Sequence, residues 1–126
     1  MKTELSNDSK TAWIKTLNKV DWTHFAVLSP DFNMNSLYAV KKMETYIQFL
    51  KRNDSNIKIF WASERFQFKK GFHIHALIKT DLTASSIQHS WKGNSRVVKY
   101  DPTLNGIEYV TKDLFEYGCE YGFELI

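Results

Sequence analysis

The chain has 126 residues, 43% hydrophobic and 15% aromatic, which is enough to form one domain with its own core. Its formal net charge of +3 allows a polyanionic partner without requiring one. The single cysteine, Cys119, excludes an internal disulfide and a cysteine-based zinc site, and suits a reducing compartment. No apolar run approaches the length of a membrane span and the polar N-terminus does not resemble a secretion signal, so we expect a soluble intracellular protein.

Hydrophobic periodicity and turn residues predict alternating helices and strands. In chain order, the first elements are a frayed polar tail (1–10), a short helix (11–20), a strand (25–29), a long helix from Asn35 or Ser36 to about Arg52, and a turn (53–56). The later ones are a strand (57–66), a basic hairpin turn (67–71), a strand (72–79), a short helix capped by Asp81 or Thr83, a strand (96–100), a loop, and a last helix (107–117) closed by Gly118. This order predicts one α+β domain over residues 1–126. Its fold would be a ferredoxin-like, RRM-like antiparallel sheet (split βαβ), with helices on one face and an extra C-terminal helix.

The strand 72–79 carries the most informative motif, His73-Ile74-His75. Because strand side chains alternate between faces, the two histidines point the same way, while Ile74 and Ile78 point toward a core. Two imidazoles on one face are well placed to share a metal ion. Two solvent-facing histidines on an ordinary strand are the alternative interpretation.

Glu64 is expected on the face that holds the histidines, because Ile59 and Trp61 of its strand take the core face. A hairpin joins the two strands, so the carboxylate and the imidazoles can lie on adjacent strands. Taken alone, Glu64 would be interpreted as a solvated carboxylate. Because it lies beside the histidine pair, we favour a role as a metal ligand. This donor set suits Mn²⁺ or Mg²⁺ for phosphate chemistry, with zinc and cobalt left open.

The last helix offers a nucleophile. Ile107, Val110 and Leu114 form its apolar stripe, whereas Tyr109 and Lys112 lie off it and close to each other. A tyrosine in such a position is often a plain surface residue. Opposite a metal-binding face, however, a phenol can attack a phosphodiester while a lysine stabilises the developing charge.

The motifs together resemble those of HUH endonucleases. His73-Ile74-His75 resembles the His-hydrophobic-His motif, Tyr109-Val110-Thr111-Lys112 resembles the Tyr-x-x-Lys nucleophile motif, and Glu64 stands where rolling-circle replication initiators place a third metal ligand. The strand 25–29 is a weak match to the first motif of the family. The order and spacing of these motifs cover roughly residues 25–117.

The resemblance implies metal-dependent nicking and joining of single-stranded or hairpin DNA at an origin, through a covalent 5′-phosphotyrosine and a free 3′ hydroxyl. Tyr109 would be the nucleophile, Lys112 its helper, and His73, His75 and Glu64 the metal ligands. A single-tyrosine initiator of plasmid or viral rolling-circle replication fits best. It would act in the cytoplasm of a bacterial or archaeal host, or in the nucleus of a eukaryotic one. Tyr117 lies on the apolar stripe, which favours packing.

Contacts to DNA are harder to predict from single residues. The candidates for phosphate contacts are Lys69, Lys70, Lys92, Arg96 and Lys99. Phe60 could stack on a base if its side of the sheet is open, or pack under the last helix instead.

Several alternatives stay open at this point. A transposase or a relaxase would use the same chemistry, although relaxases usually have a third histidine where Glu64 stands here. The absence of a Gly-rich phosphate loop leaves a minimal initiator that borrows a host helicase, an excised nuclease domain or a small transposase. From other classes, a non-catalytic RRM-like nucleic-acid-binding module or a purely structural domain would each leave the polar cluster without a role.

Overall fold

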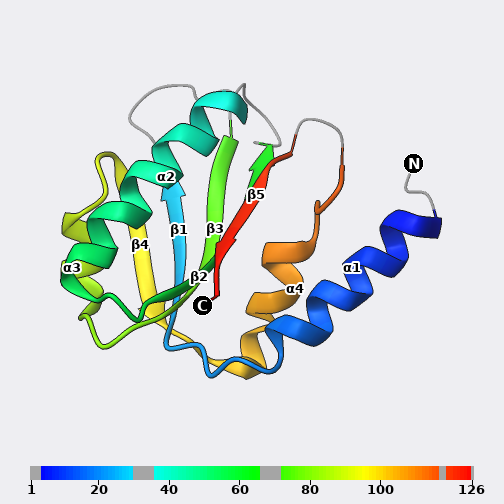
Figure 1. The fold of residues 1–126 in the computed structure, drawn as a ribbon, viewed down its shortest axis with the longest axis horizontal. Coiled ribbons are helices and arrows are strands. Elements are labelled where there is room, and N and C mark those ends of the chain that lie inside the picture. The colour runs from blue at the N-terminus through cyan, green and yellow to red at the C-terminus, as the bar shows by residue number, and fades with distance from the viewer. Residues whose placement is uncertain (1–3, 30–35, 66–71, 117–118, 126) are drawn as a thin grey trace.

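The computed structural model describes residues 4–29, 36–65, 72–116 and 119–125, which form one five-stranded antiparallel sheet with helices on both faces (Figure 1). Its elements are α1 (Glu4–Leu17), β1 (His24–Ser29), α2 (Ser36–Asn53), β2 (Lys58–Arg65), β3 (Phe72–Lys79), α3 (Ala84–His89), β4 (Asn94–Lys99), the 3-10 turn Pro102–Leu104, α4 (Gly106–Thr111) and β5 (Tyr121–Glu124). The strand order is β4-β1-β3-β2-β5, with α2 and α3 as the two crossovers. The predicted α+β, ferredoxin-like class is confirmed.

The sheet separates two cores, because the central strands are apolar on both faces. On β3, Ile74 and Ile78 join the core beneath α2 and α3, whereas Leu77 joins the core beneath α1 and α4. All three side chains are 0% exposed. The strand patterns predicted from alternation are therefore confirmed. The two histidines lie on the α1–α4 side, on the same face of β3 as Leu77.

Helices cover both faces of the sheet, so the expectation of helices on one face with an added C-terminal helix was incomplete. Helix α1, predicted only from residue 11, begins at Glu4 and packs Trp13 and Leu17 onto the sheet beside α4. The indole of Trp13 lies 5.0 Å from the ring of Phe60. None of the described helices is long and apolar enough to cross a membrane.

The C-terminal part differs most from the prediction. Helix α4 ends at Thr111, and turns occupy 112–115. Phe115 has a φ of 70°, a left-handed conformation that no α-helix continues through. The predicted helix end, Tyr117 and Gly118, lies outside the described residues, as do the predicted strand end Phe66, the hairpin turn 67–71 and the alternative cap Asn35.

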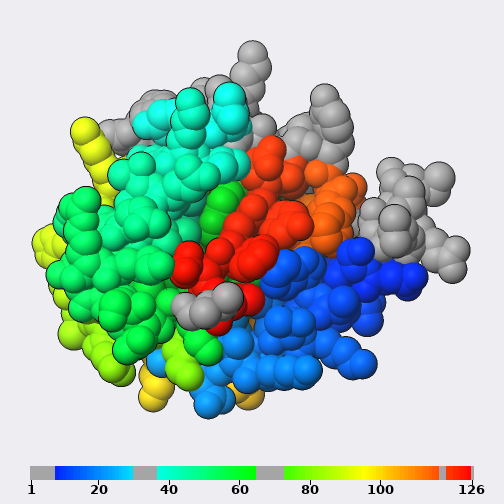
Figure 2. Space-filling view, in the orientation of Figure 1, coloured from blue at the N-terminus to red at the C-terminus, as the bar shows by residue number. Residues whose placement is uncertain are grey.

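Strand β5 has no counterpart among the predicted elements. It pairs with β2 at the edge of the sheet and is exposed between α2 and α1 in Figure 2. Gly122 lies opposite Trp61, and a Cβ at Gly122 would stand 2.5 Å from the indole nitrogen. A glycine is therefore required for this close approach, and it also weakens the strand signal in the sequence.

Candidate metal and tyrosine site

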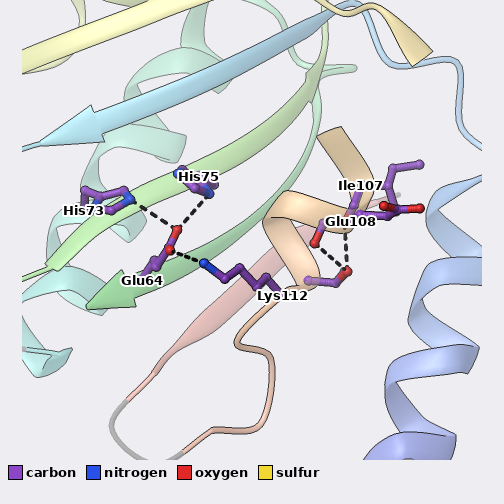
Figure 3. A network of polar contacts seen from close by, with 7 residues as sticks. Glu64, His73, His75, Ile107, Glu108 and Lys112 are labelled. Atoms are coloured by element: carbon purple, nitrogen blue, oxygen red, sulfur yellow. Dashed lines mark hydrogen bonds and ion pairs between the residues drawn. The ribbon is translucent and has the colours of Figure 1, made fainter. Parts of the chain in front are cut away.

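Strand pairing brings Glu64, His73 and His75 together. Glu64 is the registered partner of His73 across β2 and β3, and His75 is the next residue on the same face. Figure 3 shows the Glu64 carboxylate pointing between the two imidazole rings. All three side chains are largely buried, with exposed fractions of 18%, 19% and 11% for Glu64, His73 and His75.

The distances in this cluster fit a metal site. Oε2 of Glu64 lies 3.2 Å from Nε2 of His73 and 3.3 Å from Nδ1 of His75, and one donor atom from each residue lies within 4.8 Å of the others. Ligands bound at about 2.0–2.2 Å stand roughly 3.0–3.5 Å apart around one ion, and the two distances from Glu64 to the histidines fall in this range. The buried Nδ1 of His75 has no hydrogen-bond partner among the described residues. These three residues could therefore hold a metal ion.

His75 is kept neutral by its surroundings. Burial lowers the pKa of its imidazole, and the nearby His73 lowers it further, against the opposing charge of Glu64 and a hydrogen bond that the ring donates to the backbone of Tyr109. The ring of Phe25, 5.7 Å away on β1, forms part of this enclosure. A neutral imidazole is the form that binds a metal.

Lys112 completes the cluster from the end of α4. Its Nζ donates a hydrogen bond of 3.1 Å to Oε1 of Glu64, the oxygen that the histidines do not contact. Burial alone would raise the pKa of Glu64, but the hydrogen bond from Lys112, and the charge of His75 or His73 whenever either ring is protonated, outweigh burial and lower it. The same bond raises the pKa of Lys112. The acid is therefore held as a carboxylate and the lysine as an ammonium.

Tyr109 lies beside the cluster and is open to solvent. Its ring is 6.3 Å from the ring of His75, at an interplanar angle of 83°, and 56% of the residue is exposed. Ile107 and Val110 orient the helix, and Leu114 holds the turn that follows it; all three are at most 7% exposed. The predicted division of α4 into an apolar stripe and an off-stripe tyrosine is therefore confirmed.

Thr111 anchors the same helix in a way the sequence did not reveal. Its side chain is fully buried and its hydroxyl donates a 2.8 Å hydrogen bond to the carbonyl of Ile107 (Figure 3). The buried hydroxyl of Thr111 is therefore satisfied within its own helix.

A cavity of about 190 Å³ opens next to Tyr109. Its walls include Tyr109, Phe25, Val27, Val98, Leu104 and Arg96. Across the sheet, Arg96 is registered with Val27, which in turn is registered with His75. Since neighbouring strands lie about 4.8 Å apart, Arg96 stands roughly 10 Å from His75 in the same row. The cavity thus leads from Tyr109 toward the cation of Arg96, and apolar side chains of β1 and β4 line it.

The other predicted DNA contacts have different outcomes. Arg96 and Lys99 are exposed and line the cavity beside Tyr109. Lys92 is also exposed but lies with α2 and Trp91 on the opposite side of the sheet, so it does not contribute to this site. Lys69 and Lys70 lie outside the described residues.

Phe60 does not stack on a base, which corrects that prediction. Its side chain is 0% exposed and packs among Trp13, Ile107 and Leu114. The alternative interpretation, packing under the last helix, is the correct one, with α1 adding to the cover.

Sequence reasoning missed the cavity, although one signal was present. Phe25 and Val27 alternate with the core residues Ala26 and Leu28, so β1 is apolar on both faces. A strand of this kind indicates a second covered or ligand-binding face. The residues from the loop, Leu104 and Gly106, carry no comparable signal.

No family model, curated protein or solved structure matches this chain. The function is therefore argued from the site and from the motif resemblance.

Proposed function

We propose that this protein is an HUH-type endonuclease that nicks and rejoins single-stranded DNA through a covalent 5′-phosphotyrosine at Tyr109. A single-tyrosine initiator of plasmid or viral rolling-circle replication is the form we favour. One observation carries the proposal: an exposed phenol lies 6.3 Å, ring to ring, from one of two imidazoles that share a carboxylate with a lysine. A metal site alone or a tyrosine alone would not support it.

In the proposed reaction, the Tyr109 hydroxyl gives up its proton to solvent water and its oxygen attacks the scissile phosphorus. A Tyr–O–P bond to the 5′ side forms, and the bond to the 3′ oxygen breaks. The leaving 3′ oxygen takes up a proton and becomes a hydroxyl. Its attack on the phosphotyrosine reverses the step and rejoins the strand. A divalent ion, Mn²⁺ or Mg²⁺, would polarise the phosphate when bound by His73, His75 and Glu64.

The remaining residues have roles that follow from their positions. Lys112 stays protonated beside Glu64, so it acts as a positive charge near the phosphate and not as a base. The cavity next to Tyr109, with its apolar lining and Arg96, would receive the nucleotides that flank the cleaved bond.

The decisive experiment incubates the protein with labelled single-stranded DNA and Mn²⁺, with and without chelator. We expect an adduct that survives denaturation, requires metal and disappears in Tyr109→Phe, because the phenol oxygen is the proposed nucleophile. Tyr121→Phe, a change at another exposed tyrosine, is the matched control and should form the adduct normally.

Each other outcome has a defined meaning. Metal-dependent cleavage that persists in Tyr109→Phe without an adduct would assign a water nucleophile and contradict the proposal. Binding without cleavage or adduct would identify a non-catalytic RRM-like module. Transfer of the bound strand to a second DNA end would distinguish a transposase or relaxase activity from replication initiation.

Within a host, the proposal places the protein with replicating DNA in the cytoplasm of a bacterium or archaeon, or in the nucleus of a eukaryote. A host helicase is the partner that we propose for unwinding the duplex.

A further inference from the structure

A second groove lies on the opposite side of the sheet from Tyr109, between α2 and the turn that follows α3. It has a volume of about 330 Å³. Its floor is rigid, because the Tyr46 hydroxyl donates to the carbonyl of Ile87 at 2.8 Å and the Trp91 indole donates to the carbonyl of Ser29 at 2.9 Å. These bonds hold two aromatic side chains in place beneath an open surface.

The rim of this groove is basic and aromatic. Among the residues that the structure describes, three lysines line it, Lys41, Lys42 and Lys92, and none of the lining residues is acidic. Lys42 is fixed over the Trp91 ring, 4.5 Å from the centroid, and donates to the Lys92 carbonyl at 2.6 Å. A groove with cations and no acid is complementary to a polyanion.

Because exposed aromatic rings line the groove, single-stranded nucleic acid is the polyanion that fits it best. Tyr38 is 41% exposed and Phe49 is 47% exposed, and both line the groove. They are three helical turns apart on α2, roughly 16 Å at 1.5 Å per residue. Unpaired bases can stack on such rings, whereas the bases of a duplex are already stacked and paired.

The two grooves lie on either side of the same edge strand. β4 is the outermost strand of the sheet, Lys92 lies just before its start, and Arg96 stands within it on the Tyr109 side. Four residues span at most about 14 Å of extended chain. A flexible single strand of nucleic acid can therefore pass around the edge strand β4, from one groove to the other, without crossing the sheet.

We propose that the groove between α2 and Trp91 binds the continuation of the single-stranded DNA, after it leaves the cavity beside Tyr109 and turns around β4. This inference rests on the proposed function for the choice of DNA as the polyanion and for the passage of that DNA through the cavity beside Tyr109. The ligand is a phosphodiester chain contacted by Lys41 and Lys92, with bases stacked on Tyr38 and Phe49.

The test compares fluorescein-labelled oligothymidines of about 8 and about 30 nucleotides, since only the longer can span two sites of this kind. Anisotropy titrations use the full chain with Tyr109→Phe, so that cleavage plays no part. For the double variant Lys41→Ala with Lys92→Ala, we expect the affinity for the long oligonucleotide to fall about tenfold. The slope of the logarithm of the binding constant against the logarithm of the salt concentration should become smaller by about 1.4. The loss for the short strand should be much smaller.

Two further variants separate charge from stacking. The double variant Tyr38→Leu with Phe49→Leu keeps apolar bulk but loses both rings. It should lower the affinity for the long oligonucleotide about fivefold. Lys15→Ala with Lys19→Ala removes the same charge from exposed positions that line neither groove, and should change affinity less than about twofold.

Three results would overturn the inference: unchanged long-strand affinity in the first two variants, an equal loss for a duplex of the same length, or displacement of the oligonucleotide by polyglutamate at equal charge. Failure of the inference is distinct from failure of the proposed function, because adduct formation at Tyr109 is measured separately.

Discussion

Glu64 shows how one residue organises the candidate site. Its Oε2 lies between the two histidines and its Oε1 accepts from Lys112, so residues from β2, β3 and the end of α4 meet at a single carboxylate. Because Lys112 holds one oxygen, the other oxygen alone faces the imidazoles. Lys112 therefore both orients the acid and places a positive charge near any ion bound there.

Changing Lys112→Met should separate metal binding from catalysis. Removing the ammonium removes repulsion toward a divalent ion, so we expect Mn²⁺ to bind more tightly, on the order of fivefold. Adduct formation should nevertheless slow, because the positive charge near the phosphate is lost. Calorimetric titration with Mn²⁺ and adduct kinetics check the two effects.

Glu64→Gln is the comparison for this measurement and should weaken Mn²⁺ binding by at least about tenfold, since it replaces one of three ligands. If Lys112→Met weakens metal binding as much as Glu64→Gln does, Lys112 acts mainly by positioning the acid, and the repulsion argument is wrong.

Among the elements, β5 shows most clearly how the sheet edge is built. It packs Tyr121 and Phe123 against the ring of Trp13 on one side, at 6.0 and 4.9 Å, while Gly122 passes over Trp61 on the other. Lys51 of α2 forms an ion pair of 3.0 Å with Glu124. The strand therefore joins α1 and α2 to the edge of β2, and its placement depends on a residue without a side chain.

Gly122→Ala should destabilise the protein by about 1–3 kcal/mol, because the new Cβ overlaps the buried indole of Trp61. Gly106→Ala is the matched control, since its nearest neighbours, side-chain atoms of Phe25 and Tyr100, lie 3.1 Å away and need to shift only slightly. Urea unfolding followed by circular dichroism measures both. Equal midpoints for the two variants would show that Trp61 moves aside freely.

At the scale of the whole molecule, one sheet is shared by two cores and two grooves. Adjacent residues of β3 face opposite cores, Leu77 toward α1 and α4 and Ile78 toward α2 and α3, and both are fully buried. Neither core has a sheet of its own, so we expect the two to unfold together.

This shared sheet predicts similar behaviour for Leu77→Val and Ile78→Val. Each removes one buried methylene equivalent and should cost about 1 kcal/mol. Each should also shift a single unfolding transition, with tryptophan fluorescence and circular dichroism giving the same midpoint. Separate midpoints for the two probes in either variant would indicate that one core unfolds independently.

Much of the fold could be predicted from the sequence, because the short apolar run of β1, the alternating faces of β2 and β3 and the apolar stripe of α2 are local patterns. The same alternation placed His73, His75 and Glu64 on one face, and the stripe of α4 left Tyr109 outside the core. These are properties of neighbouring residues along one element.

The tertiary structure decided what depends on distant segments. The burial of Phe60 required α1, β5 formed only because β2 offered an edge and Gly122 allowed close approach, and the cavity beside Tyr109 combined β1, β4 and a loop. Local periodicity does not encode which faces meet, because that depends on packing between segments far apart in the chain. The 3.1 Å hydrogen bond between Lys112 and Glu64, which are 48 residues apart, likewise depends on packing between distant segments.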